Sequence, residues 1–78
     1  MENKFIVVTL DDWEGLYCEG KLIVDDHEIR RESLVRLMKQ HLVFDVEFKY
    51  LNEEGERIVK ESGSMFGTYE EARQYLDK

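Results

Sequence analysis

Residues 43–51, VFDVEFKYL, alternate apolar and charged side chains. Because successive side chains of a β-strand point to opposite faces of the sheet, this alternation predicts a strand with one apolar and one charged face. The apolar face is expected to carry Phe44, Val46, Phe48 and Tyr50. This is the clearest strand signal in the chain.

Three further segments have strand character. Residues 4–10, KFIVVTL, are rich in β-branched residues and apolar on both faces, which suits a central strand. In residues 15–24, GLYCEGKLIV, two β-prone runs flank Glu19-Gly20, and a two-residue connection ending in glycine predicts a tight hairpin turn. After a turn at residues 52–55, we expect residues 56–61 to return as a weaker strand.

Two segments have helical character. Residues 31–42 place their apolar side chains in one arc at helical spacing, although no good capping residue precedes them. Thr68 followed by Glu71 is a capping-box pattern, and it predicts a last helix over residues 68–78. The predicted buried positions are Leu34, Val35, Leu37, Met38, His41 and Leu42 in the first helix, and Tyr69, Ala72 and Leu76 in the second.

The predicted element order is therefore β-β-β-α-β-β-α. We expect an α+β fold, with a largely antiparallel sheet of about five strands and two helices packed on one face. A chain of 78 residues is long enough for one domain, so residues 1–78 are expected to form a single core.

Negative charge is concentrated near the N-terminal hairpin. The net charge is −7, and residues 11–28 contain seven acidic residues and one lysine. Such a chain repels phosphate backbones, so a basic protein surface is a more favourable partner than nucleic acid. The longest apolar run has four residues, which excludes a membrane span, and the lone Cys18 cannot form an internal disulfide. We therefore expect a cytoplasmic protein.

Several acidic or nucleophilic residues are candidates for catalysis or metal binding. Asp11, Asp12 and Glu14 offer oxygen ligands, but their spacing fits no EF-hand, and hydrogen bonds within a turn explain them better. His27 lies among acids without a second nitrogen or sulfur ligand nearby. Acidic neighbours should raise the pKa of the Cys18 thiol and make it a poor nucleophile. We expect no metal, no cofactor and no enzymatic activity.

The stretch LDDWEGLY, followed by GKLIV and DHEI, resembles the start of a group of short bacterial and phage-associated proteins of uncharacterised function. The resemblance covers residues 10–29. It implies no activity, cofactor or catalytic residue, but it suggests that residues 11–15 form one unit with the hairpin.

These patterns favour a small acidic, non-enzymatic protein-binding module. Trp13 is either a lid over the core or an exposed anchor for a partner. A sharper hypothesis is an inhibitor encoded by a phage or mobile element, which imitates the charge of DNA and occupies a basic host protein. The alternative is a structural or self-associating domain, a homodimer in which an exposed strand edge at residues 56–61 pairs with a second copy. The predicted partner-binding residues are Asp11, Asp12, Trp13, Glu14, Tyr17, Asp25 and Asp26.

Overall fold

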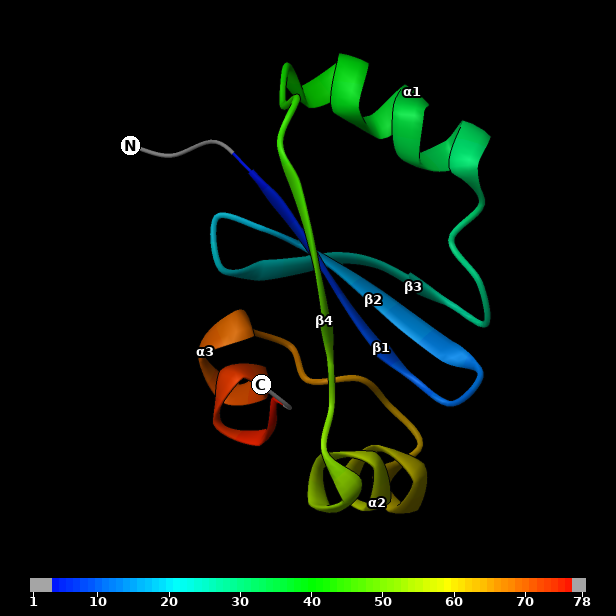
Figure 1. Cartoon of the computed structure of the whole chain (residues 1–78), viewed down its shortest axis with the longest axis vertical. Coiled ribbons are helices and arrows are strands. Elements are labelled where there is room, and N and C mark those ends of the chain that lie inside the picture. The colour runs from blue at the N-terminus through cyan, green and yellow to red at the C-terminus, as the bar shows by residue number, and fades with distance from the viewer. Residues whose placement is uncertain (1–3, 77–78) are drawn as a thin grey trace.

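A mixed four-stranded sheet with helices on both faces forms the centre of the molecule (Figure 1). The computed structural model describes residues 4–76. The elements in chain order are β1 (Phe5–Leu10), β2 (Trp13–Cys18), β3 (Lys21–Asp26), α1 (Arg31–His41), β4 (Val46–Tyr50), α2 (Glu53–Ser62), the single-turn α3 (Tyr69–Ala72) and a 3-10 turn (Arg73–Tyr75).

The first three strands form the antiparallel meander that the sequence predicts. β1 pairs with β2 through the turn at Asp11 and Asp12, and β2 pairs with β3 through Glu19 and Gly20. Glu19 and Gly20 both have positive φ, at 52° and 83°, as expected for a two-residue turn that follows the twist of the strands. The hairpin prediction is therefore confirmed at its turn.

β4 adds to the sheet in parallel with β1, giving the strand order β3-β2-β1-β4. The α+β class is confirmed, but the sheet has four strands instead of about five, and it is mixed, with two antiparallel pairings and one parallel pairing. The chain reaches β4 by way of α1, and a helical crossover is the usual way to bring a strand parallel to an earlier one. β1 is accordingly a central strand, flanked by β2 and β4.

The helices cover opposite faces of the sheet, which corrects the prediction of two helices on one face. Phe5 and Val7 pack toward α1, whereas Val8 and Leu10 pack toward α2 and α3. Since neighbouring side chains of β1 point to opposite faces and those from Phe5 to Val8 are all apolar, each face needs its own cover.

Residues 56–61 lie in α2 and not in a strand. The Asn52 side chain accepts a hydrogen bond from the Gly55 N–H at 2.8 Å, and three glutamates follow in the first turn. Both features stabilise a helix N-terminus, the first by satisfying a free N–H and the second through the helix dipole. Gly63, with φ of 77°, ends the helix.

The apolar face predicted for residues 43–51 is present but largely uncovered. The strand itself begins at Val46, and both Phe48 and Tyr50 are 59% exposed. Within the predicted apolar arc of α1, Val35 and Leu42 are also exposed, at 44% and 72%. The helix therefore covers the sheet with a narrower stripe than predicted.

The capping box at Thr68 is confirmed, since its Oγ1 accepts a hydrogen bond from the Glu71 N–H. The helix is shorter than predicted, because α3 ends at Ala72 and a 3-10 turn follows. Ala72 is fully buried, and Tyr69 and Leu76 are half-buried against the same core. The predicted positions 77–78 lie outside the described residues.

Candidate acidic binding site

Six acidic residues gather where the β1–β2 turn, the end of β3 and the segment leading to α1 meet. The strand register explains part of this arrangement, because Glu14 pairs with Asp26 and Gly15 with Asp25 across β2 and β3. We call this group the acidic end of the sheet. Its members are Asp11, Asp12, Glu14, Asp25, Asp26 and Glu28.

Trp13 is fixed beside this group by its own hydrogen bond. The indole Nε1–H donates to Asp25 Oδ2 at 3.0 Å, and the half-buried ring packs against the core formed with α2 and α3. The side chain therefore combines the two roles considered from the sequence, since it covers part of the core and keeps one side at the surface. Its polar hydrogen is already bound to Asp25.

The segment before α1 is tied to the β1–β2 hairpin by two further hydrogen bonds. Glu14 Oε1 accepts from the Ile29 N–H at 2.8 Å, and His27 Nδ1 lies 3.2 Å from the Asp12 carbonyl oxygen. Because a carbonyl can only accept, the second contact requires the proton on Nδ1. These bonds hold residues 11–14 and 25–29 together as one surface.

Lys60 of α2 forms an ion pair with the acidic end. Its Nζ lies 3.2 Å from Asp11 Oδ2, in an exposed ion pair. The hydrogen bond to Asp11 and its charge raise the pKa of Lys60, with smaller contributions from Glu56 and Asp12. Glu56 of α2 therefore lies near the ion pair of Lys60 with Asp11.

Tyr17 does not belong to this surface, so its prediction as a partner contact is wrong for the folded chain. It is 1% exposed, and its hydroxyl donates to the Phe66 carbonyl oxygen at 2.5 Å. Burial raises the pKa of Tyr17, and the charges of Asp25 and Glu71 add to this effect. Tyr17 is a core residue that fastens β2 to the segment before α3.

The other six predicted site residues do come together at the acidic end. The sequence patterns do not assign Glu28 to the site, and they do not connect Lys60 with Asp11. These two are 49 positions apart, and no local pattern indicates such a contact.

The basic residues of α1 are not paired in the way that their helical spacing suggests. Ion pairs of Glu32 with Arg36 and of Glu28 with Arg30 or Arg31 are absent within residues 4–76. Ion pairs form instead in α2, between α2 and Asp11, in β4 and near α3. Arg30 and Arg31 therefore border the acidic end without neutralising it through a direct contact.

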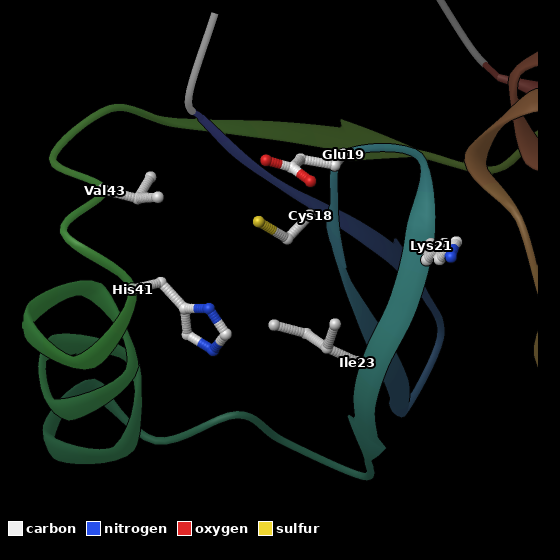
Figure 2. A pocket seen from close by; sticks show the side chains of 6 residues that line it. All are labelled: Cys18, Glu19, Lys21, Ile23, His41 and Val43. Atoms are coloured by element: carbon white, nitrogen blue, oxygen red, sulfur yellow. The ribbon is translucent and has the colours of Figure 1, made fainter.

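A separate hollow of about 300 Å³ lies between β3 and the end of α1 (Figure 2). Figure 2 shows the Cys18 thiol and the His41 imidazole facing into it, with Ile23 and Val43 beside them. Burial raises the pKa of the Cys18 thiol, and Glu19 adds to the rise, so the reactive thiolate is disfavoured. His27 is at the acidic end, so these two residues do not meet a second histidine.

Within the described part of the chain, no three His, Cys, Asp or Glu side chains are placed so that they could share a metal ion. Among the helices of residues 4–76, none has the length and apolar character needed to cross a lipid bilayer. Comparison of the chain with known protein families, with curated proteins and with solved structures found no match.

Proposed function

We propose that this protein is a non-enzymatic binding module whose acidic end engages a basic surface on another protein. The observation that carries the proposal is the gathering of six carboxylates at one end of the sheet, with Lys60 as the one cation paired to them within residues 4–76. Like charges held close together repel one another, and a basic partner relieves that repulsion when it binds.

The rigidity of this surface supports the proposal. Asp25 holds Trp13, and Glu14 holds the backbone of Ile29, so few groups need to be ordered when a partner binds. Asp12 and Glu28 are exposed, and their carboxylates make no hydrogen bond or ion pair within the described residues. They are the two acids best placed to pair with an incoming arginine or lysine.

The finer form of the proposal is an inhibitor that imitates the charge of DNA and occupies a nucleic-acid-binding protein of its host. The resemblance of residues 10–29 to phage-associated proteins motivates it. Glu56 of α2, which lies near the ion pair of Lys60 with Asp11, also supports it, because a duplex presents an elongated row of charges. The same proposal places the protein in the cytoplasm of the host.

The test is affinity capture from a host lysate with two matched double variants. Asp12→Asn with Glu28→Gln removes two charges from the acidic end. The control, Asp45→Asn with Glu70→Gln, removes two charges at the opposite end of the sheet. Asp45 lies just before Val46, where β4 begins. Glu70 follows Tyr69, whose N–H donates to the Gly20 carbonyl in the β2–β3 turn.

We expect wild type and the control to retain the same basic proteins, and the acidic-end variant to lose them. Retention should also fall as salt is added, because screening weakens contacts between exposed charges. DNA that competes with the captured protein would support the inhibitor form. Equal retention by both variants contradicts the proposal.

A further inference from the structure

Within residues 4–76, the backbone groups on the outer edge of β4 have no partner before Tyr50. Phe5 N–H donates to the Asp45 carbonyl and Leu51 N–H to the Thr9 carbonyl, at 2.9 and 3.0 Å. Since alternate residues of a strand bond to the same neighbour, residues 46, 48 and 50 direct their N–H and C=O groups away from β1. In Figure 1 β4 lies in front of β1, and no other strand or helix runs along its outer side.

The two edges of the sheet, at β3 and at β4, are covered to different extents. At the other edge, β3 is capped by the Leu22 N–H bond to the Gly67 carbonyl and by the bridge between Lys21 and Thr68. Beside β4, the described chain closes the edge only from Leu51 onward, where Leu51 bridges to Leu76. On this side of the sheet, the open edge therefore lies within β4.

Large apolar side chains accompany this open edge. Phe48 and Tyr50 are 59% exposed, and Phe44, just before the strand, is 73% exposed. Val46 packs against the core under α1, and Phe48 and Tyr50 continue on the same face, with Phe48 beside Arg31 and Leu34 at the start of the helix. An open strand edge next to exposed aromatic rings favours pairing with another strand.

The charges of β4 complement those of a second β4 in one register. If a two-fold axis passes through Phe48, then Phe48 faces Phe48, Val46 faces Tyr50, and Glu47 faces Lys49 of the other copy. The backbone groups of residues 46, 48 and 50, which point away from β1, then form hydrogen bonds with the same residues of the other copy. Glu47 and Lys49 fall at the positions between these bonded pairs, where opposing side chains are closest.

The neighbouring antiparallel registers that keep the same outward-facing residues are unfavourable. A shift in one direction puts Glu47 opposite Glu47, and a shift in the other puts Lys49 opposite Lys49. Like charges directly opposite one another destabilise a strand pair, so the sequence of β4 selects the register centred on Phe48.

We propose that a second copy of this chain pairs with β4 in antiparallel orientation about Phe48, joining the two sheets into one. In this dimer Tyr50 lies next to Val46 of the other copy, and hence near the edge of the other α1. The pairing ends where Val46 of one copy, the first residue of β4, faces Tyr50 of the other. The next residue, Leu51, is already bridged to Leu76 of its own chain. The dimer brings Phe48 and Tyr50, which are exposed in a single chain, against the other copy.

Sedimentation equilibrium at increasing concentration is the first test, since a chain of 9.4 kDa should show twice that mass. Glu47→Lys and Lys49→Glu each place like charges opposite one another, and each should raise the dissociation constant of the dimer at least about tenfold. Glu70→Lys changes the net charge as much as Glu47→Lys, far from β4, and should leave dimerisation unchanged.

Mixing the two single variants provides the decisive measurement. One copy then carries two lysines at positions 47 and 49 and the other two glutamates, so an equimolar mixture should form a mixed dimer. The double variant Glu47→Lys with Lys49→Glu should dimerise by itself. Circular dichroism identifies any variant that does not fold, as Glu47→Lys also loses the contact with Lys4.

In the dimer, amide exchange at Phe48 should slow as protein concentration rises. A wild-type chain that stays monomeric up to millimolar concentration overturns the proposal. So does a dimer whose dissociation constant is the same in wild type and both single variants, because its interface would lie elsewhere. The acidic end is untouched by these substitutions, so either result is independent of the capture experiment.

Discussion

Gly55 in the first turn of α2 is a position where a larger side chain should be costly. A Cβ built there lies 2.7 Å from Tyr75 Cβ and 3.2 Å from Leu51 Cδ2. The Tyr75 Cβ is attached directly to the backbone, so the conflict is not relieved by rotating a side chain. In Gly55→Ala, therefore, the backbone of α2 or of the C-terminal segment must move.

Two opposing effects determine the size of the change. Replacing glycine by alanine in a helix normally stabilises it by about 0.5–1 kcal/mol. Overpacking a filled site costs about 1–3 kcal/mol. We expect the close approach to dominate, so that Gly55→Ala lowers the free energy of unfolding by about 1–2 kcal/mol, with a fall in Tm of about 5–15 °C.

Urea unfolding followed by Trp13 fluorescence and by circular dichroism measures this difference. Gly67→Ala is the matched control, because no heavy atom lies within 4 Å of its added Cβ. It should change stability by less than about 0.5 kcal/mol. If Gly55→Ala is as stable as wild type or more so, the close packing of α2 against Tyr75 and Leu51 is refuted.

Three further substitutions test local features of the fold. Leu42→Gly should stabilise the chain by about 1 kcal/mol, because Leu42 ends α1 with φ of 57° and is 72% exposed, so thermal unfolding should shift upward. Glu19→Asn should raise the urea midpoint by a smaller amount, since asparagine tolerates the φ of 52° better, and an unchanged midpoint would contradict this account of the turn. Tyr17→Phe should cost about 1 kcal/mol at neutral pH through the lost hydrogen bond. Because the pKa of Tyr17 is raised in the folded chain, the stabilisation that its neutral hydroxyl provides is complete below pH 10.0 and is lost as the pH rises above that value. Tyr17→Phe should therefore lose less stability in alkali than wild type.

The N-terminal half of the fold could be predicted because its signals are local. The β-branched run of β1 and the Glu19-Gly20 turn each act over a few neighbouring residues, and both have the predicted structure. The acidic end follows from the same turns, because the hairpins bring residues 11–14 and 25–26 together.

The second half was harder because its signals depend on distant contacts. Gly55 suggested a turn, whereas its small size allows Tyr75 and Leu51 to approach α2. Asn52 with Gly55 three residues later was a usable capping signal that was missed. Similarly, the sequence pattern predicts Tyr17 as a partner contact, whereas its burial depends on distant residues, Phe66 and Tyr69 among them.

The parallel pairing of β4 with β1 also has a consequence for the order of folding. The β1–β2–β3 meander closes through short turns, whereas Lys4 meets Glu47 43 positions later in the chain. Closing that long loop costs more chain entropy, so we expect the meander to form early and β4 to dock last. Until it docks, Val7 and Val8 of β1 have an open flank, and a nascent chain is most vulnerable to misassembly during that interval.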